Sequence, residues 1–385
     1  MIMANVHIAL VGSQTYPVFL GIAETSPDIV VLVHSSTSLA EAQRIAAEFE
    51  GSGTEFRYEQ FDPVDAAQVL DKARSLAQSL DDGHYFTVNL TGGTKVWSIL
   101  FREAFASKPH VKFIYVDQTC AFYDLSNMEK SDVSTAVDIN RIFRLNNTSI
   151  LKSMDFNQLT EEDLNAIPVI RYLYLSKRFA FTALTVPTTR PGENKIRNNK
   201  DSFVFQGSSI SWDHETKTID FQFKTKTGMI EKTLSSPHIF DLVFFAGWFE
   251  AEVARHLSMW KHSHEVKMNV QFPYVDGKTK NEIDVIVNTG KRLLFVECKT
   301  HIHNLTDLDK FSKAVRNYGG MGCHALFVTF ESLSQLAEEK CRDNGIIPFS
   351  FKDALDACHE EDKSGVITNA LHQLLDEQLF TINKK

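Results

Sequence analysis

The first 130 residues alternate apolar segments with amphipathic ones, and this alternation strongly constrains the fold. Five segments have the length and composition of strands: residues 6–11, 28–35, 55–61, 85–90 and 111–117. Three of these are nearly continuous apolar runs, as expected of a parallel sheet that is covered on both faces. Helical patterns lie between them, at residues 38–50, 64–80 and 94–107. The alternation predicts an α/β domain with a Rossmann-like, doubly wound sheet.

The last 145 residues have a different order of elements. The patterns predict, in order, a helix at about 240–260, strands at 266–272, 282–288 and 292–299, a helix at 305–318 and a strand at 324–330. The helix at 305–318 is expected to stop at Gly319-Gly320, a normal helix end. A helix near 332–342, a short strand at 346–350 and a C-terminal helix near 367–380 are expected to follow. The order αβββαβ is therefore predicted for the C-terminal domain.

The middle of the chain is predicted to be a small connector between the two domains. Residues 159–175 have the pattern of one or two helices, and residues 186–202 form a polar, basic loop. Apolar and polar residues alternate over 209–225 around a polar turn, which predicts a β-hairpin. We therefore divide the chain into residues 1–140, a connector with a hairpin at 141–238, and residues 239–385.

Composition indicates a folded, soluble protein. The chain has 385 residues, of which 43% are hydrophobic and 23% charged, so two or three domains are expected. No apolar run approaches the roughly 20 residues that cross a bilayer, and the start lacks the basic region of a signal peptide. Five scattered cysteines without a CxxC pair favour a reducing cytoplasm. The net charge of −9 argues against a nucleic-acid coat protein but not against a nuclease.

The segment RLLFVECKT, residues 292–300, begins as a buried strand and ends in charge. An apolar run from Leu293 to Val296 is followed by Glu297 and Lys299, which alternation places on one face of the strand. Because burying a charge without a partner is costly, both side chains need partners.

The segment NTGK, residues 288–291, joins this strand to the one before it and is typical of a tight turn. If Asn288 pairs with Lys291, Asp284 lies diagonally across from Glu297 on the same face, with Cβ atoms about 7–8 Å apart. A salt bridge at the sheet edge is the plain alternative. In the catalytic interpretation, Asp284 and Glu297 hold Mg²⁺ or Mn²⁺, while Lys299 neutralises charge on a phosphate or lowers the pKa of the attacking water.

Further candidates surround this strand. Glu250 lies on a small-residue stripe of the helix at 240–260, and it is either a catalytic residue near the metal or a partly solvated glutamate. Glu282 is expected at the surface. The basic residues of the helix at 305–318 contact a phosphate backbone or are simply solvated, and two nearby histidines line the cleft or are bystanders: Lys310, Lys313, Arg316, His301 and His303.

Two polar loops at the ends of predicted parallel strands form a second candidate site. In NLTGGTKVW, residues 89–97, two glycines let the backbone approach a ligand, and the following helix N-terminus is suited to phosphate. The loop VGSQTYP, residues 11–17, lies at the same sheet edge, where such sheets bind ligands. A plain strand–helix turn is the alternative, since neither the Walker A nor the dinucleotide spacing is present. The candidate ligand-binding residues are Ser13, Gln14, Thr15, Thr91, Gly92, Gly93, Thr94 and Lys95.

These motifs carry a family resemblance. EIDVIV and LLFVECKT, with Asp284, Glu297 and Lys299, resemble the PD-(D/E)xK restriction-endonuclease-like superfamily over about 240–350, although Ile283 replaces its proline. With SQT, NLTGGTK and GWFEAEVARHL, most of the chain resembles the nucleases of type III CRISPR systems that carry a CARF (CRISPR-associated Rossmann fold) domain.

The resemblance implies a specific function. In that family, cyclic tetra-adenylate binds across a homodimer of CARF domains and allosterically activates paired nuclease domains. These domains cut single-stranded or nicked substrates with Mn²⁺ or Mg²⁺ in antiviral defence. This chain is therefore expected to be a metal-dependent endonuclease acting on DNA, single-stranded RNA or both. A ligand-independent repair or restriction nuclease and a non-catalytic nucleotide sensor are the alternatives.

Overall fold

The computed structural model describes residues 3–185, 200–274, 277–320, 322–358 and 365–380. The chain forms two compact units. The first comprises Met1–Ile150, Asn288–Leu293 and Ala314–His324, and the second comprises Leu151–Val287, Leu294–Lys313 and Ala325–Lys385. Among the described helices, none is long and apolar enough to cross a membrane.

The first unit contains a seven-stranded sheet in the order β3-β2-β1-β4-β5-β6-β7. Its five parallel strands are β1 (Asn5–Leu10), β2 (Ile29–His34), β3 (Glu55–Gln60), β4 (Tyr85–Asn89) and β5 (Val111–Val116). The antiparallel strands β6 (Ala121–Asp124) and β7 (Glu129–Asp132) extend it at one edge. The parallel strands confirm the Rossmann-like prediction, whereas β6 and β7 were not predicted.

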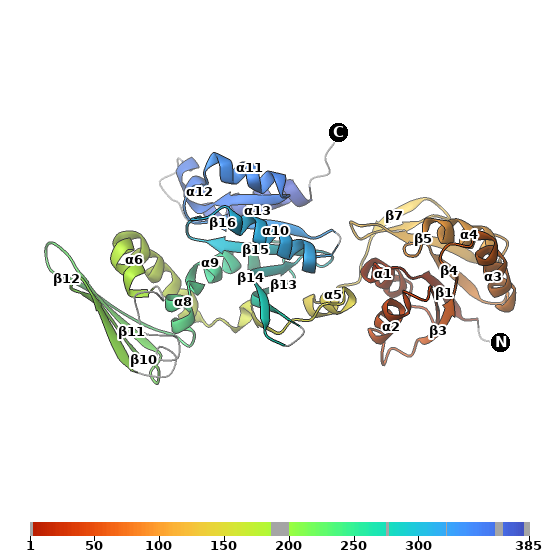
Figure 1. The fold of residues 1–385 in the computed structure, drawn as a ribbon, viewed down its shortest axis with the longest axis horizontal. Coiled ribbons are helices and arrows are strands. Elements are labelled where there is room, and N and C mark those ends of the chain that lie inside the picture. Colours follow the sequence, from red (N-terminus) through yellow and green to blue (C-terminus); the bar gives the residue numbers. More distant parts are fainter. Residues whose placement is uncertain (1–2, 186–199, 275–276, 321, 359–364, 381–385) are drawn as a thin grey trace. The chain divides into compact units, whose positions relative to one another are not determined.

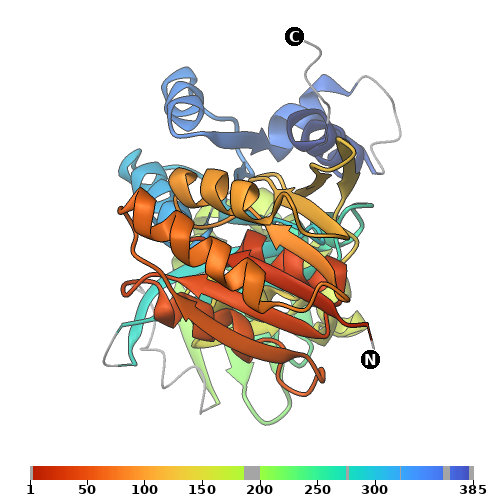
Figure 2. The same cartoon turned by 90° about the vertical axis from the view of Figure 1, so that its right-hand side faces the viewer.

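Helices cover both faces of this sheet (Figure 1). The helices of the unit are α1 (Thr15–Thr25), α2 (Leu39–Ala47), α3 (Ala66–Ser79), α4 (Lys95–Phe105) and α5 (Ile139–Leu145). Helices α1 and α2 lie on one face, and α3 and α4 run side by side across the other, as Figure 2 also shows. The three predicted helices are confirmed as α2, α3 and α4.

Helix α1 corrects the expectation that residues 11–17 are a loop. Thr15 is its first residue, and nearly all of its first two turns are buried. A helix that is buried all round has no polar stripe, so its sequence lacks the period by which amphipathic helices are recognised. Gly21 lets α1 lie close to β4, because a Cβ at that position would stand 2.3 Å from Asn89 Nδ2.

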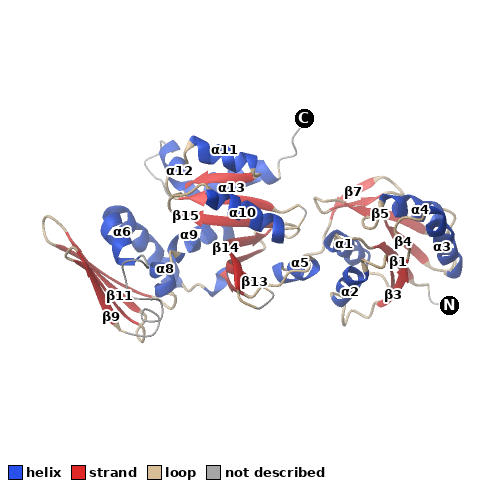
Figure 3. Ribbon diagram, viewed as in Figure 1, coloured by secondary structure: helices blue, strands red, loops and turns tan. Residues whose placement is uncertain are grey.

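The second sheet has six strands in the order β17-β16-β15-β14-β13-β8 (Figure 3). Its strands are β8 (Lys152–Asp155), β13 (Glu265–Pro273), β14 (Thr279–Asn288), β15 (Leu293–Lys299), β16 (His324–Thr329) and β17 (Ile346–Ser350). The surrounding helices are α8 (Ile239–Phe244), α9 (Gly247–Ser258), α10 (Thr306–Tyr318), α11 (Gln335–Asp343), α12 (Phe351–Ala357) and α13 (Val366–Leu379). The predicted order αβββαβ is confirmed by α9 to β16. The single helix expected over 240–260 is instead two, because Ala246 adopts φ 61° and breaks it.

The connector contains more β structure than expected. Strands β10 (Ser208–Asp213) and β11 (Thr218–Lys224) form the predicted hairpin, flanked by the unpredicted β9 (Asp201–Phe205) and β12 (Met229–Ser235). The apolar face of this antiparallel sheet packs on α6 (Glu161–Thr185), where the rings of Phe181 and Phe221 stack 5.6 Å apart. A short 3₁₀ helix, Phe156–Gln158, precedes α6. Most of the predicted loop 186–202 lies outside the described residues.

A buried carboxylate links α6 to the segment before α8. The Asp163 side chain is fully buried, accepts the backbone N–H groups of Thr160 at 2.9 Å and His238 at 3.0 Å, and lies 2.8 Å from His238 Nδ1. Burial raises the pKa of Asp163, but these hydrogen bonds outweigh burial, and the pKa ends below its ordinary value of 3.8.

Asp163→Asn is expected to lower the free energy of unfolding at pH 7 by about 1–3 kcal/mol, because the amide leaves buried donors unsatisfied. Since the pKa of Asp163 is lowered, its stabilisation is complete above pH 3.8 and is lost as pH falls through the folded-state pKa. Urea unfolding at pH 7 and in acid checks both parts. The control is Asp220→Asn, which alters an exposed carboxylate hydrogen-bonded to Thr233. Equal stability of both variants would contradict the assignment.

Candidate functional site

The hairpin of β14 and β15 carries the predicted catalytic residues. The Thr289 N–H donates to Arg292 O at 2.9 Å, so these residues, rather than Asn288 and Lys291, close the turn. The expected register is therefore wrong by two residues. Because side chains alternate with a period of two, this shift leaves Asp284, Glu297 and Lys299 on a common face.

The Lys299 ammonium group lies close to both carboxylates. Lys299 Nζ lies 2.6 Å from Glu297 Oε1 and 3.9 Å from Asp284 Oδ2. The backbone N–H of Cys298 donates to Asp284 Oδ2 at 2.7 Å. Asp284 is 8% exposed, whereas the Lys299 side chain is 37% exposed, so the cluster leads from the buried sheet toward solvent. The charges that end this apolar strand thus have one another as partners.

The electrostatics of the cluster favour an added cation. Burial and, next, the nearby Glu297 raise the pKa of Asp284 to about 7, against the opposing effect of Lys299. Burial also raises the pKa of Glu250 well above its usual value, with Asp284 the next largest cause. Burial lowers the pKa of Lys299, but the carboxylates outweigh burial and the pKa ends above its usual value. Three acidic groups therefore share one ammonium group.

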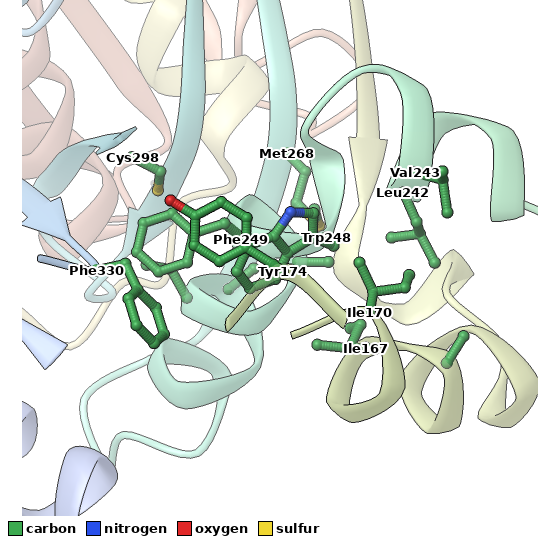
Figure 4. Packing of buried hydrophobic residues seen from close by; sticks show 14 of the residues in the cluster. Ile167, Ile170, Tyr174, Leu242, Val243, Trp248, Phe249, Met268, Cys298 and Phe330 are labelled. Atoms are coloured by element: carbon green, nitrogen blue, oxygen red, sulfur yellow. The ribbon is translucent and has the colours of Figure 1, made fainter. Parts of the chain in front are cut away.

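Glu250 reaches this cluster from the first turn of α9. Gly247 permits the tight turn before it, because a Cβ there would stand 2.9 Å from Asp241 O. Aromatic packing fixes the helix: Trp248 lies 5.4 Å from Tyr174 and Phe249 lies 6.1 Å from Phe330, measured between ring centroids (Figure 4). Phe249, Val253 and Leu257 of this helix are buried, whereas Phe245 is only half-buried at the end of α8.

The donor set fits one hard cation. Among the described residues, no three His, Cys, Asp or Glu side chains form a metal-binding group. However, Asp284 and Glu297 already converge on a single cation, the Lys299 ammonium group. Mg²⁺ usually binds through one or two carboxylates together with waters and substrate phosphates, so two carboxylates are sufficient.

The other candidates near this site are placed as follows. Glu282 is exposed and accepts a hydrogen bond from Gln271 at 2.9 Å. His301 and His303 are exposed and contact each other edge to face. Lys310, Lys313 and Arg316 lie on the exposed side of α10, where Lys310 pairs with Asp307. Burial raises the pKa of the Cys298 thiol, which disfavours the nucleophilic thiolate form.

In the first unit, the strand order reverses between β1 and β4. The loops that follow these strands lie at this switch point, where open α/β sheets bind ligands. They border a cavity of about 130 Å³. Its lining residues are Gly12, Ser13, Gln14, Pro17, Thr91, Gly92, Gly93, Tyr115, Val116 and Gln118.

Glycines allow the two loops to approach closely. A Cβ at Gly92 would stand 2.1 Å from Leu10 O, and one at Gly12 would stand 3.1 Å from the Gly93 backbone nitrogen. Gly93 also adopts φ 71°, a conformation that L side chains rarely take. No larger residue fits at Gly92 without displacing the backbone of β1.

Five of the eight predicted ligand-binding residues line this cavity: Ser13, Gln14, Thr91, Gly92 and Gly93. The others do not line it. Thr15 is buried and donates to Leu145 O, Thr94 caps α4 by accepting the Trp97 N–H at 3.1 Å, and Lys95 is exposed at the start of α4. The Thr91 hydroxyl accepts the Val116 N–H at 2.8 Å.

Outside the two predicted loops, sequence reasoning missed three lining residues, Tyr115, Val116 and Gln118. Tyr115 is 36% exposed on β5, and Gln118 lies in the turn after that strand. The order of the predicted strands could have indicated these residues. Because β5 is parallel to β4, both strands end at the same edge of the sheet.

Two family models match separate parts of the chain. A family model described as the Card1 CARF domain matches residues 6–141, and a model described as the Card1-like endonuclease domain matches residues 242–348. No curated protein matches the sequence.

Several solved structures share the fold. Can2 from Sulfobacillus thermosulfidooxidans, in complex with cyclic tetra-adenylate, aligns with a TM-score of 0.67 and 16% identity over 97% of this chain and 99% of that one. Protein VC1899 from Vibrio cholerae aligns with a TM-score of 0.67 and 15% identity over 97% and 98%. A type III CRISPR defence DNA nuclease activated by cyclic oligoadenylate aligns with a TM-score of 0.57 and 15% identity, over 94% of this chain and 53% of that one.

The two family matches occur in the order in which the two candidate sites occur along the chain, and together they cover most of it. The chain therefore joins a CARF domain of the Card1 type to a Card1-like endonuclease domain.

Proposed function

We propose that this protein is a metal-dependent endonuclease that cyclic tetra-adenylate activates in type III CRISPR antiviral defence. Its substrate would be DNA, cut as single strands or nicked as duplex, single-stranded RNA, or both. The observation that carries the nuclease proposal is the convergence of Asp284 and Glu297 on the Lys299 ammonium group. In this proposal, residues 1–140 would bind the cyclic ligand and residues 239–385 would cleave the nucleic acid. Residues 141–238 would connect these two domains.

The charged cluster can divide the work of phosphodiester hydrolysis. Asp284 and Glu297 would hold Mn²⁺ or Mg²⁺, and the bound metal would supply Lewis-acid stabilisation and an activated water. Lys299 places a point cation where negative charge develops on the phosphate. Glu250, whose pKa is raised by burial and by Asp284, is suited to carry a proton beside the scissile bond.

The cavity at the β1–β4 switch point is suited to a cyclic oligonucleotide. The N-termini of α1 and α4 lie beside its loops and offer backbone N–H groups to phosphates. At about 130 Å³, the cavity is smaller than ordinary ligand pockets of roughly 300–1,000 Å³, so one protomer would hold only part of such a ring. A homodimer would offer the same loops twice to a two-fold symmetric ligand.

A binding screen tests the sensing half of the proposal. Thermal-shift measurements with cyclic oligoadenylates of different ring size are expected to show stabilisation that is greatest with cyclic tetra-adenylate, since ligands that bind the folded state stabilise it. Linear tetra-adenylate serves as the control. No shift with any cyclic oligoadenylate would contradict the proposed sensing function.

Tyr115→Ala is expected to weaken binding of cyclic tetra-adenylate about 5- to 150-fold, because base–aromatic stacking contributes about 1–3 kcal/mol per base. The partly exposed ring borders the cavity, where an adenine can stack on it. Tyr115→Phe keeps the ring and is expected to bind like the wild type. Isothermal titration calorimetry on both variants measures the difference, and equal affinities would exclude stacking on Tyr115.

A further inference from the structure

The turn of the catalytic hairpin belongs to the first unit. Asn288–Leu293 cluster with the residues that surround the ligand cavity, whereas Asp284 and Glu297 belong to the second unit. The chain thus leaves the first unit and passes directly into the strands that carry the charged cluster. Glu297 lies only five positions after Arg292, or about 17 Å along an extended strand.

Four side chains hold this turn within the first unit. Arg292 donates from Nη2 at 2.9 Å and from Nε at 3.3 Å to the Thr119 carbonyl oxygen. The hydroxyl of Tyr16 donates to Lys291 O at 3.0 Å, and Cys120 Sγ lies 3.4 Å from the same oxygen. Asn288 donates from Nδ2 to Val137 O at 2.6 Å. Tyr16 and Asn288 are buried, whereas the hydrogen bonds of Arg292 to Thr119 are exposed.

The segment that anchors the turn also borders the ligand cavity. Gln118 lines the cavity, and the next residue, Thr119, supplies the carbonyl group that Arg292 binds. The loop after α10 packs on the same segment, because a Cβ at Gly322 would stand 2.4 Å from Gln118 O. Tyr16 lies two residues after Gln14, another lining residue. A ligand that moves Gln118 or Gln14 therefore acts on residues that bind the hairpin turn.

We infer that Arg292 is a positioning residue that transmits occupancy of this cavity through β15 to Glu297 and Lys299. The inference rests on the proposed function, since it names how ligand binding would regulate that nuclease site. A ligand shifts an equilibrium only by its differential affinity for two states, so the Arg292–Thr119 contact must differ between the free and liganded protein. Tyr16 supports the same turn through its hydroxyl group.

Two variants of the full-length protein test the inference. Arg292→Gln and Tyr16→Phe are expected to lower the ratio of cleavage with and without cyclic tetra-adenylate at least about fivefold, the lower end of typical allosteric coupling. Their ligand affinity, measured by calorimetry, is expected to stay within about threefold of the wild type, less than this coupling. Arg342→Gln, which alters an exposed arginine on α11, is the matched control and is expected to keep the wild-type ratio.

Hydrogen exchange separates positioning from a merely structural role. In the wild type, adding cyclic tetra-adenylate is expected to change amide protection over residues 293–299, and in Arg292→Gln this change is expected to disappear. A folded Arg292→Gln variant with the wild-type activation ratio would overturn the inference. If that variant does not fold, the test is made with Tyr16→Phe, which loses a single oxygen atom. A wild-type activation ratio in Tyr16→Phe would then overturn the inference. If the wild type binds the ligand but cleaves at the same rate with and without every cyclic oligoadenylate, the proposed function itself is wrong.

Discussion

Glu297→Gln is expected to lower metal-dependent cleavage about 10²- to 10³-fold, and Lys299→Ala is expected to do the same. Glu297 is one of the two carboxylates that converge on a cation, and Lys299 is the only ammonium group that the described cluster places between them. Removing one preorganised electrostatic group from an active site typically costs this much. Nicking of a supercoiled plasmid and cleavage of labelled single strands, both with Mn²⁺, measure the loss.

Two controls make this result specific to chemistry. Glu282→Gln changes an exposed carboxylate next to the cluster and is expected to reduce cleavage only slightly. Binding of cyclic tetra-adenylate to Glu297→Gln is expected to equal that of the wild type, because the ligand cavity has no residue of the cluster in its lining. Wild-type cleavage by Glu297→Gln or by Lys299→Ala would rule out this cluster as the active site.

Gly92→Ala is expected to abolish activation by the ligand and to lower the free energy of unfolding by about 1–3 kcal/mol, the usual cost of overpacking. The added Cβ would stand 2.1 Å from Leu10 O and 2.9 Å from Val18 Cγ2, so the loop after β4 must move away from β1. That movement would open the cavity between the two loops. Calorimetry with cyclic tetra-adenylate and urea unfolding measure the two effects.

Gly83→Ala provides the matched glycine control. A Cβ at Gly83 would have its nearest contact at 3.4 Å, with the side chain of Asp81, so little strain is expected. Binding and stability of this variant should therefore resemble the wild type. Gly92→Ala with unchanged ligand affinity would show that the close approach of the two loops does not shape the binding site.

The parallel sheet and the αβββαβ order were predictable because each rests on strong local patterns. Continuous apolar runs identified β1 and β2, and Gly319-Gly320 correctly marked the end of α10. The failures have physical causes. Helix α1 is buried on nearly all sides and shows no polar stripe, and the break at Ala246 depends on a left-handed backbone conformation that a non-glycine residue rarely takes.

The cluster of Asp284, Glu297 and Lys299 was predictable because successive side chains of a strand point to opposite faces. A shift of two residues in the register between β14 and β15 leaves each side chain on the same face. The ligand cavity was predictable only in part. Ser13 and Gly92 follow strands in plain motifs, whereas Tyr115 is an ordinary strand residue in sequence and joins the site only through sheet order. The anchoring of Arg292 by Thr119 joins residues 173 positions apart, and no local pattern reports such a contact.

Cleavage by the purified wild-type protein with Mn²⁺, with and without cyclic tetra-adenylate, tests the central claim most directly. Supercoiled plasmid, labelled single-stranded DNA and labelled single-stranded RNA are the substrates to compare. We predict that at least one of them is cut rapidly when the cyclic ligand is present and slowly when it is absent. No cleavage with any divalent metal, or cleavage at the same rate with and without every cyclic oligoadenylate, would contradict the account.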